Sequence, residues 1–121
     1  MAAPVVHFEI ISATHQAPFY ERLFGWQANS DNPMGYGTVS AEQAGLSGGL
    51  GQPYEDPANS PAYATIYVAV PDIDATLEKA VQEGGKVALS RRAFFPGGPT
   101  IAQLTDPAGV RIGLLEQPPA S

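Results

Sequence analysis

The stretch YATIYVAVPDIDATLEKAVQEGG, residues 63–85, predicts a strand that runs directly into a helix. Its first part alternates in character from residue to residue, which is the period of a strand with two different faces. One face is an apolar row made of Ile66, Val68 and Val70. The other face consists of Thr65, Tyr67 and Ala69. We expect the apolar row to pack on the helix and the second face to line a separate space.

The period then changes, and the residues after Pro71 predict a helix over 73–83. Asp72 has the short acceptor side chain of an N-cap, and Gly84 with Gly85 supplies a C-terminal stop. The apolar face of this helix consists of Ile73, Leu77, Ala80 and Val81.

A second version of this strand and helix opens the chain. When the later stretch is moved back by 58 residues, Thr65 falls on His7 and Tyr67 falls on Glu9. A short helix over 18–24 follows, as the longer helix follows the later strand. The copies are too few and the period is too long for a solenoid. The sequence therefore predicts two similar modules paired within one domain.

Composition limits the possible function. The chain has 121 residues, no cysteine and a formal net charge of −6, so it fits one domain that folds without disulfides. Without cysteine there is no thiolate metal ligand or cysteine nucleophile, which fits a reducing cytoplasm. The acidic charge argues against nucleic acid and anionic membranes as partners. No apolar run approaches the roughly 20 residues of a membrane span, and MAAPVV lacks signal-peptide features, so we expect a cytoplasmic protein.

Taken in order, the chain predicts the arrangement β-α-β-β-β twice. Module one, residues 5–50, is expected to have strands at 5–11, 26–28, 36–41 and 45–50. Residues 51–62 are expected to be a linker between the modules, because their prolines have no N–H to donate to a β-ladder. Module two, residues 63–116, is expected to have strands at 63–70, 86–90, 100–104 and 110–115. Residues 117–121 are expected to form a frayed tail.

Several features occur together in this chain: the β-α-β-β-β doublet, the run FYERLFGW at 19–26, the run YVAVPDIDA at 67–75 and the turn DPAG at 106–109. Their order and spacing over residues 5–116 resemble the vicinal oxygen chelate superfamily, the group of glyoxalase, bleomycin-resistance proteins and extradiol dioxygenases. The resemblance implies an α+β fold of two tandem βαβββ modules whose curled mixed sheet encloses a cleft. It also implies a homodimer and a metal on the cleft floor, held by one residue from each of four strands.

Most of the four ligand positions implied by the resemblance carry residues that are poor metal ligands. These positions carry His7, Thr65, Gly113, and either Ser47 or Gly49. A Lewis-acid site needs about three converging N, O or S ligands and one open position. Glu116 is no simple substitute, because it follows Gly113 by three residues and therefore lies on the opposite face of a strand. We predict no cofactor, with a divalent metal held through His7 as the alternative.

Two interpretations of His7 and Glu9 stay open, since both side chains lie on one strand face. In the first, they are catalytic: His7 is a cleft base or hydrogen-bond donor, and the Glu9 carboxylate raises its pKa. In the second, the two side chains satisfy each other or water in a polar cleft. His15, in the turn before the first helix, is expected to be exposed.

Other candidate ligand-binding residues lie on the same face or on the final hairpin. The last two strands can direct Gln103 and Arg111 into the cleft, although Arg111 can equally reach solvent at the sheet edge. Phe95 belongs to a loop, residues 94–98, that is either a lid, a dimer contact or simply buried. The full predicted set is His7, Glu9, Ser47, Thr65, Tyr67, Phe95, Gln103, Arg111 and Gly113.

The glycines at positions 45, 48, 49 and 51 do not form a phosphate loop, because neither a helix N-terminus nor a lysine follows them. We interpret them as strand positions that something approaches closely, such as a partner subunit or a ligand.

These observations predict a small-molecule-binding protein of the glyoxalase/bleomycin-resistance type that holds an organic ligand without the usual metal. The alternative is a glyoxalase-like lyase or isomerase, or a dioxygenase-type enzyme, in which His7 with Glu9 is a metal ligand or an acid/base. A structural or interaction role has the least support. The expected partners are a small organic molecule and a second copy of the chain, with no nucleic acid and no membrane.

Overall fold

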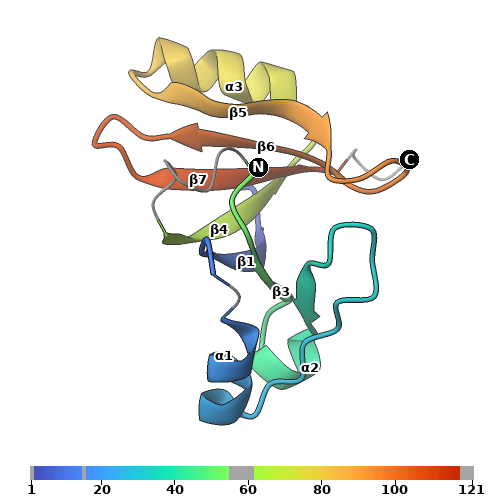
Figure 1. The fold of residues 1–121 in the computed structure, drawn as a ribbon. Coiled ribbons are helices and arrows are strands. Elements are labelled where there is room, and N and C mark those ends of the chain that lie inside the picture. The colour runs from blue at the N-terminus through green and yellow to red at the C-terminus, as the bar shows by residue number, and fades with distance from the viewer. Residues whose placement is uncertain (1, 15, 55–61, 118–121) are drawn as a thin grey trace. The chain divides into compact units, whose positions relative to one another are not determined.

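The computed structural model describes residues 2–14, 16–54 and 62–117. It contains two compact units (Figure 1). The N-terminal unit comprises residues 7–65, and the C-terminal unit comprises the residues from 66 onward together with the first six. His15, most of the predicted linker and the predicted tail beyond Gln117 lie outside the described residues. Each unit has a mixed sheet and helices, so the α+β class is confirmed.

The N-terminal unit has a three-stranded sheet and two short helices. Its elements are β1 (Val5–Ile11), α1 (Ala17–Phe24), β2 (Gly37–Val39), α2 (Ala41–Ala44) and β3 (Gly48–Gly51). The strands follow the order β2-β3-β1, in which β1 and β3 are parallel while β2 and β3 are antiparallel. Helix α1 begins with a proline in its first turn and ends at Gly25 in the left-handed conformation, as the sequence indicates.

The predicted strand at 26–28 is wrong. Only Asn29 pairs, through an isolated bridge to Thr38. The reason is that side chains take the backbone donors of this segment: Gln27 N donates to Gln43 Oε1, and Ala28 N donates to Glu21 Oε2 at 2.9 Å. A second correction concerns the hairpin that follows. The strand at 36–41 shrinks to Gly37–Val39 because the good helix formers after Ser40 form α2, and β3 begins only after Ser47.

The C-terminal unit follows the predicted β-α-β-β-β order. Its elements are β4 (Tyr63–Val70), α3 (Ile73–Gln82), β5 (Lys86–Ala93), β6 (Thr100–Thr105) and β7 (Arg111–Glu116). The strand order is β4-β7-β6-β5, with β4 and β7 parallel and the other pairs antiparallel. Strand β5 runs three residues past its predicted end, with two irregularities in its register. Figure 1 shows α3 lying along β5.

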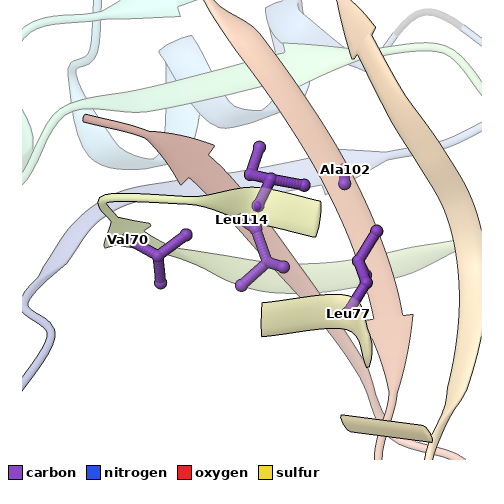
Figure 2. Packing of buried hydrophobic residues seen from close by; sticks show 5 residues of the cluster. Val70, Leu77, Ala102 and Leu114 are labelled. Carbon is purple, nitrogen blue, oxygen red and sulfur yellow. The ribbon is translucent and has the colours of Figure 1, made fainter. Parts of the chain in front are cut away.

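The core of the C-terminal unit joins α3 to the sheet, as Figure 2 shows. It consists of Val70, Ile73, Leu77, Ala102 and Leu114, with Val68 and Leu104 packed against it. The expected packing of Val68 and Val70 on the helix is confirmed. Ile66 is 38% exposed and does not join this core, since it precedes Val70 by four residues, or about 13 Å of strand. Val81 is also exposed, because α3 contacts the sheet through its first turns.

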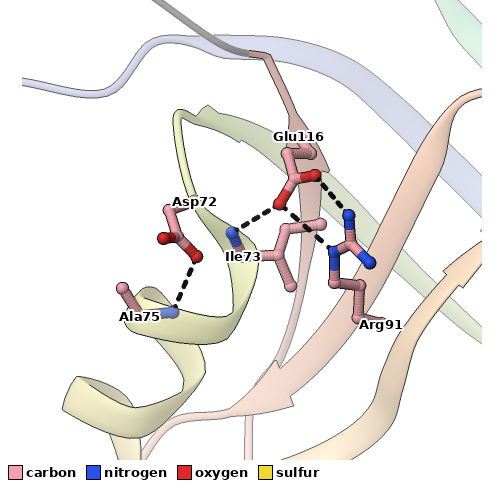
Figure 3. A network of polar contacts seen from close by, with 5 residues as sticks. All are labelled: Asp72, Ile73, Ala75, Arg91 and Glu116. Atoms are coloured by element: carbon pink, nitrogen blue, oxygen red, sulfur yellow. Dashed lines mark hydrogen bonds and ion pairs between the residues drawn. The ribbon is translucent and has the colours of Figure 1, made fainter.

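Two carboxylates close the N-terminus of α3 (Figure 3). Asp72 accepts a hydrogen bond from Ala75 N at 3.0 Å, which confirms the predicted N-cap. Glu116 accepts one from Ile73 N at 2.9 Å and forms an ion pair with Arg91 at 2.8 Å. Glu116 is therefore engaged on the helix side of β7.

Strand register supports the internal repeat. In the N-terminal unit, Glu9 of β1 lies opposite Gly49 of β3. In the C-terminal unit, Tyr67 of β4 lies opposite Gly113 of β7. Both pairs are parallel, so the correspondence of Glu9 with Tyr67 in the sequence is matched by an equivalent pairing. Within the described part of the chain, no helix is long and apolar enough to cross a bilayer.

Candidate functional site

The polar cluster of the N-terminal unit is centred on a buried carboxylate. Strand β1 places Glu9 on the same face as His7, and Glu9 is only 2% exposed. Its Oε2 atom accepts hydrogen bonds from two hydroxyls, Tyr36 Oη at 2.8 Å and Tyr54 Oη at 2.6 Å. A buried carboxylate needs such donors, because an ionised group without them is strongly disfavoured away from water.

His7 joins this cluster through Tyr36. The His7 Nε2 atom lies 3.0 Å from Tyr36 Oη, and the Nδ1 atom lies 2.9 Å from the hydroxyl of the exposed Ser47. Tyr36 thus connects His7 to Glu9 by two successive hydrogen bonds. Burial lowers the pKa of His7, because removal from water disfavours the imidazolium. The expectation that Glu9 raises this pKa is therefore wrong, because desolvation of the imidazole decides the direction of the shift.

The glycines of β3 make room for aromatic rings. A Cβ atom on Gly49 would overlap the Tyr36 ring and hydroxyl, and one on Gly51 would lie 2.7 Å from the same ring. A Cβ atom on Gly48 would overlap Phe8. At Gly48, Gly49 and Gly51 something does approach closely, but the groups that do so are side chains of this chain. The prediction is wrong for Gly45, which ends α2 in the left-handed conformation and has nothing within 4 Å of an added Cβ.

The polar row of the C-terminal unit runs across three strands. Tyr67 of β4 and Gln103 of β6 both lie opposite Gly113 of β7. The fully buried Gln103 donates from Nε2 to Tyr67 Oη at 2.9 Å, and its Oε1 accepts from Arg111 Nη1 at 2.6 Å. Arg111 is half-buried and directs this nitrogen along the row. The bond from Arg111 orients the amide so that its nitrogen faces the tyrosine.

Gly113 is the position at which the resemblance implies a metal-binding carboxylate. A Cβ atom there would lie 2.6 Å from the Tyr67 ring, so a carboxylate side chain fits only if Tyr67 moves. In the N-terminal unit, the side chains that could ligate a metal are His7 and Glu9. Both ring nitrogens of His7 and the Oε2 atom of Glu9 already have hydrogen-bond partners. Within the residues described, no three His, Asp or Glu side chains form a group that could hold a metal. These residues do not make the implied four-ligand site.

The remaining predicted residues are Thr65 and Phe95. Thr65 is buried, with 8% of its surface exposed. Phe95 is half-buried in a tight loop, where its ring lies over Gly98 and Phe94 N donates to Pro99 O at 2.8 Å. A lid role for this loop stays a prediction.

Each unit therefore brings part of the predicted set together. His7, Glu9 and Ser47 meet in the N-terminal unit, while Tyr67, Gln103, Arg111 and Gly113 meet in the C-terminal unit. The sequence interpretation missed Tyr36 and Tyr54. Glycines at 49 and 51, two apart on one strand face, were a usable signal for a bulky ring such as Tyr36. Tyr54 had no such signal, because it falls in the stretch interpreted as a linker.

A family model described as "Glyoxalase/Bleomycin resistance protein/Dioxygenase superfamily" matches residues 13–114. A relative from Mycobacterium tuberculosis (strain CDC 1551 / Oshkosh), named "Putative glyoxylase CFP32", is 34% identical over 103 residues. This match covers 81% of the present chain and 39% of the relative. The Mycobacterium bovis protein of the same name matches equally well. The chain thus spans about two-fifths of the length of these relatives.

Solved structures share the fold. A hypothetical protein, BH1468 from Bacillus halodurans C-125, matches with a TM-score of 0.65 and 15% identity, over 100% of this chain and 99% of that one. Methylmalonyl-CoA epimerase from Mycobacterium tuberculosis matches with a TM-score of 0.62 and 17% identity, over 95% of this chain and 88% of that one. At these identities the likeness extends to the fold alone.

Proposed function

The chain belongs to the glyoxalase/bleomycin resistance protein/dioxygenase superfamily, and from that premise we propose that it binds a small organic molecule without the usual metal. The observation that carries this proposal is the Tyr67 ring at Gly113, where an added Cβ would lie 2.6 Å from the ring. An aromatic side chain here takes the space that a carboxylate ligand needs. His7 supports the proposal as well, since its Nε2 atom is hydrogen-bonded to Tyr36.

The candidate binding groups suit an organic ligand with a few polar atoms. Small-molecule sites combine apolar and aromatic walls with a small number of well-placed polar groups. In the N-terminal unit these groups are His7, Ser47 and the Glu9 carboxylate with its tyrosines. In the C-terminal unit they are Tyr67 and the Arg111–Gln103 pair. Thr65 and Phe95 complete the proposed ligand-binding set.

Thermal melting tests the proposal. Nickel, zinc or manganese should leave Tm nearly unchanged, because a ligand stabilises the folded state only by RT ln(1 + [L]/Kd). Apolar and aromatic compounds from a small-molecule panel should include some that raise Tm. Tyr67→Ala should weaken such a ligand, since a buried aromatic contact contributes on the order of 1 kcal/mol. Tyr20→Ala, which alters the half-buried aromatic cluster at α1, is the matched control. Stoichiometric metal at His7, with a Tm rise of several degrees, would overturn the proposal.

A second candidate function is acid–base catalysis by His7, with Glu9 linked to it through the Tyr36 hydroxyl. The lowered pKa of His7 favours it, because a general base must be unprotonated near neutral pH. One of the structural neighbours is named for methylmalonyl-CoA, a carbon acid that can be used as a probe. Incubation in D2O should then introduce deuterium into the probe, and His7→Ala should abolish this exchange rather than alter affinity. If no carbon acid in a panel takes up deuterium, the hypothesis of acid–base catalysis by His7 is contradicted.

Dimerisation and a cytoplasmic location stay part of the proposal. Family members commonly form dimers, and the acidic, cysteine-free composition fits a reducing compartment. Light scattering at micromolar concentration tests the dimer directly, and a monomer would contradict it.

A further inference from the structure

The hydroxyl of Tyr36 sets the direction of a hydrogen-bond chain in the N-terminal unit. A phenol has one hydrogen to donate and can accept at its oxygen. Tyr36 Oη donates its hydrogen to Glu9 Oε2 at 2.8 Å. Towards any other neighbour the Tyr36 oxygen is therefore an acceptor.

This direction determines which nitrogen of His7 carries the hydrogen. His7 Nε2 lies 3.0 Å from Tyr36 Oη and must donate to it, because the hydroxyl hydrogen is already given to Glu9. A neutral imidazole has one N–H, so a hydrogen on Nε2 leaves a lone pair on Nδ1. That atom lies 2.9 Å from Ser47 Oγ, and the serine hydroxyl is then the donor.

Both the ring and the backbone of Tyr36 are fixed by neighbouring groups. Its ring fills the space above Gly49 and Gly51, where added Cβ atoms would collide with it. Its backbone is fixed by the Asn32 side chain: Tyr36 N donates to Asn32 Oδ1 at 3.0 Å, and Asn32 Nδ2 donates to Tyr36 O at 2.6 Å. A side chain that is fixed through its ring and its backbone can impose one orientation on a neighbouring imidazole.

We propose that Tyr36 is a positioning residue that holds His7 as the Nε2–H tautomer, so that Nδ1 accepts a hydrogen bond from the ligand in place of Ser47. Ser47 is exposed, and its hydroxyl can turn away when another donor arrives. The ligand group at this point is then an O–H or N–H donor on a neutral or cationic molecule. A carboxylate is disfavoured, because it has no hydrogen to offer and the Glu9 carboxylate lies one hydroxyl away from His7. The ligand half of this inference rests on the proposed binding function.

Nitrogen NMR of the ligand-free protein tests the tautomer without any ligand. The chain has two histidines, so 15N-histidine labelling gives two imidazole signal sets, and His7→Gln identifies that of His7. At a pH where His7 is neutral, we expect the pattern of a protonated Nε2 and an unprotonated Nδ1. Tyr36→Phe should give a mixture of both tautomers. Tyr54→Phe should keep the wild-type pattern, because the Tyr54 hydroxyl donates to Glu9 Oε2 and the Tyr36 hydroxyl is still there to accept from His7 Nε2. A protonated Nδ1 in the wild type, or an unchanged pattern in Tyr36→Phe, would overturn the inference.

Two monosubstituted benzenes test the ligand class. Phenol offers an O–H donor, and benzoate at neutral pH is an anion without one. Phenol should shift the His7 Nδ1 resonance, and Ser47→Ala should enlarge the shift because the competing hydroxyl is gone. A shift with benzoate but not phenol, or with neither probe, overturns the ligand class. A wild-type tautomer that differs from Nε2–H overturns the positioning role even if small molecules raise Tm, so the two failures are distinguishable.

Discussion

The two units use the same strand pairing to support different chemistry. In each, a glycine on a parallel strand lies opposite a polar residue, Glu9 opposite Gly49 and Tyr67 opposite Gly113. In the N-terminal unit the ring above the glycine comes from another segment, Tyr36, so the facing position is left to an ionisable carboxylate. In the C-terminal unit the facing residue is itself the ring. The pairing of the two parallel strands thus recurs in both units while the side chains on them diverge, although the N-terminal unit has no strand at 26–28 to match β5. The two clusters therefore have different chemistry.

The largest expected effect comes from filling the glycine positions. Gly49→Ala should destabilise the protein by at least about 1–3 kcal/mol, because the new methyl group overlaps the fixed Tyr36 ring. Gly113→Ala should destabilise the protein less, because its Cβ would lie 2.6 Å from the Tyr67 ring. A smaller movement of that ring removes the clash. Urea unfolding of both variants measures the difference.

Double variants show whether the rings are the cause. Tyr36→Ala should remove most of the additional cost of Gly49→Ala, and Tyr67→Ala should do the same for Gly113→Ala. Additive effects in both cycles would show that these glycines are required for a reason other than ring packing.

The next effect concerns the tyrosine hydroxyls. Tyr36→Phe removes a donor to a carboxylate and should cost about 1.5–3 kcal/mol, the range for hydrogen bonds to charged groups. Tyr67→Phe removes an acceptor from the neutral Gln103 amide and should cost about 1 kcal/mol. Thermal and urea unfolding provide both values. A larger loss for Tyr67→Phe than for Tyr36→Phe would mean that the hydrogen bond to the Glu9 carboxylate is not the stronger of the two.

The sequence predicted the C-terminal unit better than the N-terminal unit for physical reasons. The strand and helix of residues 63–82 have strong periodicity, an N-cap at Asp72 and a glycine stop, so local signals agree with the fold. The segment after Gly25 has weak local signals, and its structure is decided by backbone N–H groups that donate to the side chains of Glu21 and Gln43.

The same contrast applies to the candidate site. Strand alternation was enough to select His7 with Glu9 in the N-terminal unit and Tyr67 and Gln103 in the C-terminal unit, because alternation decides which residues share a face of a strand. Tyr36 and Tyr54 reach Glu9 from positions 27 and 45 residues away in sequence, and no local period encodes such contacts. A resemblance to a family fixes which positions to examine, but the contacts of each side chain come from packing.

The helices allow a smaller comparison. Asp72→Ala should destabilise the protein by about 1 kcal/mol, because Asp72 caps α3 through Ala75 N. Gln16→Ala should have almost no effect, because the Gln16 side chain makes no capping bond to α1. Thermal melting followed by circular dichroism compares the two. Equal losses would mean that the cap geometry of α3 contributes little.

The smallest expected effect is the pH dependence that Glu116 adds to the C-terminal unit. Hydrogen bonds from Arg91, followed by the bond from Ile73 N, hold the pKa of Glu116 below its ordinary value. A lowered folded-state pKa contributes stability that is present above the unfolded value, about 4.3, and is lost as the pH falls through the folded value. Glu116→Gln should therefore melt below the wild type at pH 7, and the gap should close as the pH falls below about 4.

Salt separates the two sources of this effect. Arg91 is 46% exposed, so about 1 M salt should weaken the ion pair but leave the bond from Ile73 N largely intact. Arg91→Gln should consequently remove the salt-sensitive part of the pH dependence and keep a smaller remainder. If Arg91→Gln leaves the wild-type pH profile unchanged, the capping bond alone accounts for the lowered pKa. If it removes the whole profile, the bond to Ile73 N contributes nothing to the pH dependence, and the apolar core is what fixes α3 to the sheet.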